Sequence, residues 1–204
     1  MKKRKLVLII IVFAVILAIL NVENIAKNIY PYKHRQYIEK YSAENGLDPM
    51  LIAAIIKTES NFDERAKSNK DAYGLMQLTP ETAKWISEKM KIQNFNEHML
   101  YDPETNIKMG CWYVKNLQNE FKDMDLVLAA YNAGRGRVSK WLKDPEHSKD
   151  GKNLHYIPFK ETDKYVKKVN VSHNIYKTLY NNQKKNKTQL IRDMFKNFHI
   201  SSDF

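Results

Sequence analysis

The sequence predicts an all-helical domain that follows one N-terminal membrane-spanning helix. Apolar residues recur at three- and four-residue steps through most of the chain, which is the period of amphipathic helices. No segment shows the convincing apolar and polar alternation of a half-buried strand. An uninterrupted apolar run of 15 residues lies at 6–20, directly after a basic cluster.

The composition excludes several classes of protein. The 204 residues are 43% hydrophobic and 28% charged, which is ordinary globular usage and rules out wholesale disorder. The single cysteine, Cys111, excludes an intramolecular disulfide framework and a cysteine-based zinc site. The net charge is +11, but four of the positive charges stand in the first five residues. Because no basic stripe interleaved with aromatic residues is present, we expect no nucleic-acid partner.

The apolar run at 6–20 is the predicted membrane segment. As a helix it is about 22 Å long, and Asn21 and Val22 can extend it while Lys5 snorkels. An uncleaved signal anchor is favoured over a cleavable signal peptide, because no pair of small residues of the A-x-A kind follows the run. A buried soluble helix fits less well, since such helices are seldom apolar on every face. Under the first two interpretations the basic end stays in the cytoplasm, so residues 1–22 predict a single-pass protein of the cell membrane whose domain is extracytoplasmic.

Capping signals place the first four helices of the exported part. Residues 34–44 form the first, which ends at Asn45-Gly46. Three pairs of a capping residue and a proline begin the next three helices: Asp48-Pro49, Thr79-Pro80 and Asp102-Pro103. The second of the four helices runs to about Glu59, and the third ends near Met90.

Two more helices complete the predicted domain. Asp125 is the expected cap of the fifth, which ends at 132–134, and an apolar stripe extends through 160–181. After Tyr180 the sequence turns polar and basic. We therefore predict a domain at 28–181 and a solvated tail at 182–204.

Glu59 stands out within the second helix. It follows Ile52, Ile55 and Ile56 at helical spacing, which puts its carboxyl on an apolar face. Burial there would raise the carboxyl pKa and keep the group protonated near neutrality, as a general acid requires. The simpler alternative is that a glutamate at a helix end turns to solvent, and periodicity alone does not decide between the two.

Four sequence blocks in order bear on that choice. They are Glu59-Ser60-Asn61-Phe62, then 72–82 (AYGLMQLTPET), then 129–134 (AYNAG after Ala129) with Asn106 and Gly110 before it, and finally 157–166 (IPFKETDKYV). Together these blocks resemble those of the soluble lytic transglycosylases, a lysozyme-like family that cleaves bacterial peptidoglycan. The resemblance covers about residues 35–180 and implies a compact, helical, lysozyme-like domain. One departure is visible, because Asp71 stands where the family often has glycine.

The resemblance implies roles for particular positions. Glu59 matches the catalytic acid/base, and Ser60 matches a residue that helps to hold the substrate or the carboxyl. The implied substrate-binding positions are Gly74, Leu75, Met76, Gln77, Tyr131, Asn132, Glu161 and Tyr165. Chemistry fits these expectations: Met76 offers an adaptable apolar surface, Gln77 and Asn132 offer amide groups, and the Tyr131 hydroxyl can orient Glu59.

The expected reaction is a non-hydrolytic cut between N-acetylmuramic acid and N-acetylglucosamine, which leaves a 1,6-anhydro sugar. One carboxyl suffices if the C6 hydroxyl of the muramic acid replaces water. A hydrolytic muramidase needs a second carboxylate; among the candidates Asp63, Glu64, Asp71 and Glu161, Glu161 is favoured. A third alternative is a non-catalytic glycan-binding or scaffold component of an envelope machine.

The remaining chemistry-bearing residues favour structural roles. Trp85, Trp112 and Trp141 are interpreted as core, and Cys111 as a small buried hydrophobe. The histidines show no metal-ligand spacing, so we predict no metal and no cofactor. The expected partners are peptidoglycan glycan strands and the membrane, and we expect a monomer.

Overall fold

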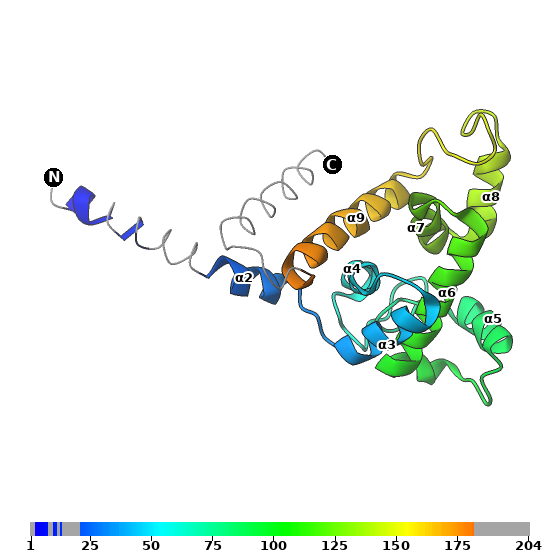
Figure 1. The fold of residues 1–204 in the computed structure, drawn as a ribbon, viewed down its shortest axis with the longest axis horizontal. Coiled ribbons are helices and arrows are strands. Elements are labelled where there is room, and N and C mark those ends of the chain that lie inside the picture. Colours follow the sequence, from blue (N-terminus) through cyan, green and yellow to red (C-terminus); the bar gives the residue numbers. More distant parts are fainter. Residues whose placement is uncertain (1–2, 8–9, 12, 14–20, 182–204) are drawn as a thin grey trace.

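A computed structural model describes residues 3–7, 10–11, 13 and 21–181 (Figure 1). Most of the predicted membrane segment at 6–20, and the predicted tail at 182–204, lie outside the described residues. Within the described part, no helix combines the length and the apolar character that crossing a membrane requires.

The described domain is helical, and two isolated antiparallel bridges, Lys67 with Tyr73 and Tyr73 with Leu78, are its only β-type pairing. The elements in chain order are α2 (Val22–Ile29), α3 (Arg35–Asn45), α4 (Pro49–Ser60), α5 (Pro80–Met90), the 3₁₀ helix η1 (Glu97–Tyr101), α6 (Pro103–Phe121), α7 (Met124–Ala133), α8 (Arg135–Lys143) and α9 (Lys160–Tyr180). This confirms the helical class expected from periodicity.

The side chains expected to cap α4, α5 and α6 do so. Asp48 Oδ1 accepts from the Met50 amide at 2.9 Å, Thr79 Oγ1 from the Thr82 amide at 3.3 Å, and Asp102 Oδ2 from the Thr105 amide at 2.8 Å. Each bond satisfies an amide that lacks a partner in the first helical turn. At the other end of α3, Gly46 adopts the left-handed conformation (φ +63°) that ends the helix.

The cap of α7 is a correction. Asp123, not Asp125, precedes the helix, and its Oδ1 accepts from the Leu126 amide at 3.0 Å. Asp125 lies in the first turn and instead accepts a hydrogen bond from Asn170 on α9. Asp123 and Asp125 are equally good capping residues by type, so residue type alone does not predict which of them begins the helix. In the structure the helix begins at Met124, and Leu126 in its first turn is buried.

Two of the α-helices, α2 and α8, and the 3₁₀ helix η1 are not predicted from the sequence. α8 begins directly after Gly134 with no capping side chain, so it carries no start signal. α2 lies between the apolar run and the predicted domain boundary at 28, which falls inside this helix. α2 packs on α9 through Ala26, in an apolar cluster with Ile175 and Leu179.

α4 is the centre of the domain. Its residues from Met50 to Ile56 are all buried, as in a helix surrounded by others. α9 crosses over it and extends from α2 at one end to α7 at the other, while α3 and α6 pack together on the opposite side (Figure 1). The last turn of α4 therefore comes close to α9, α7 and the 61–79 loop.

Candidate active site

Glu59 lies in that last turn of α4, on the face formed by Ile52, Ile55 and Ile56. These three isoleucines are fully buried, and Glu59 itself is partly exposed. Burial disfavours the charged form and raises the pKa of the Glu59 carboxyl to about 7, while the Tyr165 hydroxyl acts in the opposite direction. The expectation of a carboxyl with a raised pKa on an apolar face therefore agrees with the structure.

No second carboxylate contributes to this shift among the described residues. If another acid lay within a few ångströms, its negative charge would raise the Glu59 pKa further. Burial and Tyr165 are the causes of the shift. The arrangement is that of a single carboxyl group able to hold and release a proton near neutral pH.

Two tyrosines flank Glu59 from distant parts of the chain, Tyr131 on α7 and Tyr165 on α9. The charge of Glu59 adds to burial in raising the pKa of both phenols. Both hydroxyls therefore stay protonated and remain hydrogen-bond donors. α7 packs on α9, and α9 in turn packs on α4, which explains how residues far along the chain from Glu59 reach it.

The hydroxyl of Tyr131 is already engaged. It donates to the Met76 carbonyl at 2.7 Å, so its hydrogen holds the 72–78 segment and is not directed at Glu59. The Tyr165 hydroxyl is buried and has no partner of normal hydrogen-bond geometry among the described residues. Tyr165 is thus the tyrosine whose hydroxyl is available to the Glu59 carboxyl or to a ligand.

Ser60 connects α4 to the same segment. Its hydroxyl lies 2.8 Å from the Leu75 carbonyl and 3.2 Å from the Ile56 carbonyl. The hydroxyl therefore positions the chain beside Glu59, and its hydrogen is occupied within the protein.

Gly74 and Gln77 shape the 72–78 segment. Gly74 has φ +72°, and a Cβ there would stand 2.1 Å from the Leu100 carbonyl oxygen, so only glycine fits. Gln77 also has a positive φ of 48°, and its Nε2 donates to the Ala66 and Gly74 carbonyls at 3.1 and 2.9 Å. Both hydrogen bonds of its amide nitrogen are made within the loop, which leaves Oε1 as the group that can accept a hydrogen bond from a sugar hydroxyl.

Leu75 and Met76 depart from the expected sugar contacts. Leu75 is 1% exposed and Met76 is fully buried, so neither side chain offers a surface to a ligand. Met76 packs against α6 at Gly110, where a Cβ would stand 2.2 Å from the Met76 sulfur. The 72–82 block resembles a sequence block that lines a ligand cleft, but the sequence does not show that the side chains of Leu75 and Met76 point into the core.

Asn106 on α6 is a site-forming residue that the predicted set omitted. Its buried Oδ1 accepts from the Met76 amide at 2.8 Å, and its Nδ2 donates to the Tyr73 and Leu100 carbonyls at 3.0 and 2.8 Å. One side chain thus satisfies three backbone groups of two segments. The spacing of Asn106 and Gly110 in the sequence was the available signal.

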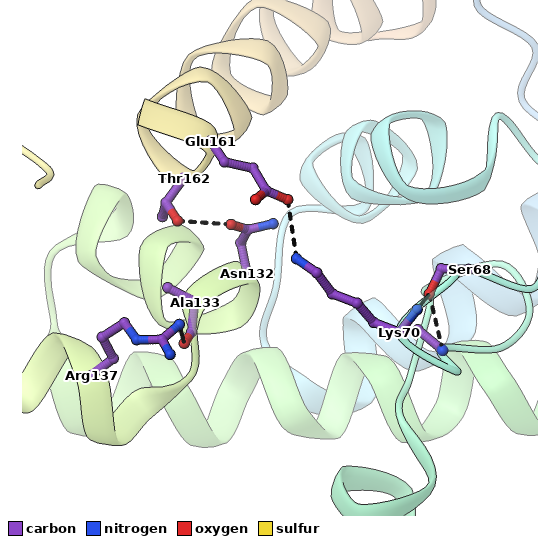
Figure 2. A network of polar contacts seen from close by, with 8 residues as sticks. Ser68, Lys70, Asn132, Ala133, Arg137, Glu161 and Thr162 are labelled. Carbon is purple, nitrogen blue, oxygen red and sulfur yellow. Dashed lines mark hydrogen bonds and ion pairs between the residues drawn. The ribbon is translucent and has the colours of Figure 1, made fainter. Parts of the chain in front are cut away.

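Asn132 on α7 and Glu161 on α9 are both exposed (Figure 2). The Asn132 Oδ1 accepts from Thr162 at 2.9 Å. Glu161 is 74% exposed at the start of α9, and Lys70 of the 61–79 loop reaches across to it at 3.2 Å (Figure 2). These polar groups come from three separate segments of the chain.

The aromatic and sulfur residues mostly occupy the structural places expected of them. Cys111 is fully buried and Trp141 is 7% exposed, as core residues are. Trp85 and Trp112 pack edge to face with ring centroids 5.5 Å apart and remain partly exposed.

One group of side chains in the described part has the spacing of metal ligands. Asp144, Glu146 and His147 lie after α8 with ligand atoms within 4.8 Å of one another. The two acids are exposed, and such groups are common on surfaces without an ion. They are not part of the Glu59 site.

The comparisons with known proteins concern the same stretch of chain. The family model described as the transglycosylase SLT domain matches residues 36–154. The soluble lytic murein transglycosylase of Escherichia coli K12 is 34% identical over 143 residues, which are 69% of this chain and 22% of that protein. The membrane-bound lytic murein transglycosylase C of Sodalis glossinidius is 37% identical over 117 residues, covering 52% of this chain and 33% of its own.

Solved structures give the same picture. An inactive glutamate-to-glutamine mutant of the lytic transglycosylase Slt from Pseudomonas aeruginosa superposes with a TM-score of 0.65 at 37% identity, over 74% of this chain and 25% of that one. The complex of a 70-kDa soluble lytic transglycosylase with bulgecin A gives a TM-score of 0.68 at 29% identity, over 78% and 26% of the two chains. The chain thus spans about a quarter of the length of the first of these relatives.

Proposed function

Because the chain belongs to the transglycosylase SLT domain family, we propose that it is a peptidoglycan lytic transglycosylase that uses Glu59 as its single acid/base. The observation that carries this proposal is the Glu59 carboxyl, which burial keeps partly protonated near pH 7 with no second carboxylate of the described residues acting on it. The relative whose glutamate-to-glutamine mutant is inactive supports a mechanism with one indispensable carboxyl.

The proposed reaction has two proton transfers through one group. Glu59 donates its proton to the glycosidic oxygen between N-acetylmuramic acid and N-acetylglucosamine as that bond breaks. The acetamido group of the substrate stabilises the positive anomeric carbon. The ionised Glu59 then takes the proton from the muramic C6 hydroxyl, whose oxygen closes the 1,6-anhydro ring. The hydroxyl outcompetes water because it is part of the same molecule.

The other site residues support this carboxyl in the proposal. The buried hydroxyl of Tyr165 donates to Glu59 once the carboxyl is ionised. Ser60, Gly74, Met76 and Tyr131 form the rigid wall beside it. Gln77 Oε1, Asn132 Nδ2 and Glu161 are the polar groups offered to the sugars, and Glu161 must exchange Lys70 for substrate to do so.

The products test the reaction. The protein is incubated with purified peptidoglycan, and the released muropeptides are weighed by mass spectrometry. We expect products lighter than hydrolytic ones by one water per cut, about 18 Da, because the C6 hydroxyl replaces water. Free reducing ends would instead establish a muramidase, and glycan binding without any cut would establish a scaffold.

A pair of variants tests the residue. Glu59→Gln keeps the shape of the side chain and removes its proton chemistry, so cleavage should fall at least about a thousandfold. Glu88→Gln is the matched control, since Glu88 is exposed on α5. Turnover by a folded Glu59→Gln protein at the wild-type rate would refute the role.

We further propose that residues 1–22 anchor the protein in the cell membrane, with residues 28–181 as the catalytic domain outside the cytoplasm and 182–204 as a tail. The apolar run after a basic cluster supports this, as does the name of the membrane-bound relative. Alkaline extraction of membranes should leave the full-length protein in the pellet. A shortened chain in the soluble fraction would favour the cleaved signal peptide.

A further inference from the structure

A pocket of about 570 Å³ lies between α4 and α9, and none of the site residues named above lines it. Three lysines line it: Lys57 from α4, and Lys164 and Lys168 one turn apart on α9. Tyr30, which follows α2, forms another part of the wall. No carboxylate of the described residues lines the pocket, so three ammonium groups gather in one concave site without a compensating charge in its wall.

Lys57 is held in place. Its Nζ donates to the Ile29 carbonyl at 2.5 Å and to Asn61 Oδ1, and it lies 5.3 Å from the centre of the Tyr30 ring. Burial lowers its pKa, which marks the cost of desolvating this charge. An anion in the pocket would offset that cost.

Lys164 and Lys168 form no ion pair within the described ranges. Like charges one turn apart on a helix repel each other, and neighbouring acids usually relieve this. Elsewhere on α9 that is what happens, since Lys167 pairs with Asp163 at 3.0 Å. The two pocket lysines are therefore arranged as for an anion from outside the domain, and an ammonium group binds phosphate as a strong point charge.

The position of the pocket favours one source of phosphate. α2 begins at Val22, directly after the apolar run, and its eight residues span about 12 Å. Ile25 and Ile29 of α2 are 46% and 50% exposed. Exposed apolar residues beside basic groups are typical of surfaces that lie at a membrane interface.

We propose that this pocket binds the phosphate of an anionic phospholipid head group and holds α2 and α9 against the membrane surface. The inference rests on the anchoring proposed above and is independent of the proposed cleavage. A phosphodiester of a wall polymer has the same charge, but nothing in its chemistry would make use of Ile25 and Ile29.

The test uses the full chain in uncharged detergent micelles and measures binding of short-chain phosphatidylglycerol by calorimetry. Zwitterionic phosphatidylcholine is the comparison lipid. The variant Lys164→Gln/Lys168→Gln removes two pocket charges. Lys149→Gln/Lys152→Gln removes two exposed charges from the 144–159 loop and is the matched control.

We expect the dissociation constant for phosphatidylglycerol to rise about tenfold in the pocket variant and less than about twofold in the control. Equal effects in the two variants, equal binding of both lipids, absence of binding, or tighter binding of a glycerol-phosphate oligomer than of the lipid would each overturn the proposal. Peptidoglycan cleavage should be unchanged in both variants, so a failure of the cleavage assay in the wild type bears on the proposed function alone.

Discussion

At the scale of single residues, Glu59 couples stability to pH. Its pKa is about 7 in the folded protein, above the ordinary value of 4.5. A carboxyl whose pKa is raised on folding favours the folded state at low pH, and this contribution is lost as the pH rises from about 4.5 through 7. The contribution of Glu59 to the free energy of unfolding is therefore least favourable at the pH values where the carboxyl is ionised.

Glu59→Gln should remove this dependence. The amide cannot ionise, so we expect the variant to match the wild type near pH 4 and to exceed its stability by about 2 to 3 kcal/mol at about pH 8. Urea unfolding at both pH values measures the difference. An identical gap between the two proteins under the acidic and the alkaline condition would contradict a buried carboxyl at this position.

Tyr165 also changes the pKa of the Glu59 carboxyl. Its hydroxyl lowers the Glu59 pKa, so Tyr165→Phe should raise that pKa and move the alkaline limb of the cleavage profile upward by about half a pH unit. Tyr156→Phe, which changes a 51% exposed ring, is the control and should leave the profile in place. A downward shift in the Tyr165 variant would show that the phenol acts in another way.

At the scale of elements, the 72–78 segment depends on the backbone of Gly74. Gly74→Ala would place a Cβ against the Leu100 carbonyl at positive φ, and backbone cannot yield as a flexible side chain does. We expect a loss of about 3 kcal/mol or more, because backbone strain and overpacking add at this position.

Gly136→Ala is the opposite case and the matched control. Gly136 lies in α8, and a methyl group added there would have no atom within 4 Å, so alanine should stabilise by about 0.5 to 1 kcal/mol. Thermal unfolding of the two variants should therefore shift in opposite directions. Two shifts of the same sign would mean that the segment relaxes around the added methyl.

Prediction from the sequence succeeded where one residue carries its own signal. A capping side chain followed by a proline predicts a helix start from two adjacent residues, as at Asp48 and Asp102. It failed for α8, which starts after Gly134 without a capping side chain and is defined by the buried Val138 and Trp141. Those contacts are tertiary, and no local pattern specifies them.

The same division applies to the candidate site. Helical spacing placed Glu59 beside three isoleucines, because both features belong to one helix. The inward direction of Met76 and the engagement of Tyr131 depend on α6 and α7, which approach the 72–78 segment only in the folded chain. Motif matching therefore found the segment but not which of its atoms face outward.

At the scale of the whole molecule, α2 packs onto the domain and is not a free linker. Ala26 is 2% exposed against α9, and Tyr180 donates to the Tyr30 carbonyl at 2.8 Å. If the apolar run spans the membrane as proposed, only Asn21 separates its end in the sequence from a helix that packs on the domain.

Truncation tests how far α2 belongs to the domain. A chain that begins at Asn21 keeps α2 and should unfold as the described domain does. A chain that begins at Pro31 exposes Ile175 and Leu179, and we expect it to be about 1 to 2 kcal/mol less stable in urea. Equal stability of the two chains would show that α2 rests on α9 without contributing to folding.

The hydrogen bonds around Asn106 also have a consequence for motion. The amides of Tyr73, Gly74, Met76, Gln77 and Leu78 all donate within the protein, although none of them lies in a helix. Such amides exchange with deuterium only when the structure opens, and here opening requires that the buried Asn106 lose its partners. The wall beside Glu59 should thus exchange as slowly as the helices around it, so that an incoming ligand meets a surface already in its final shape.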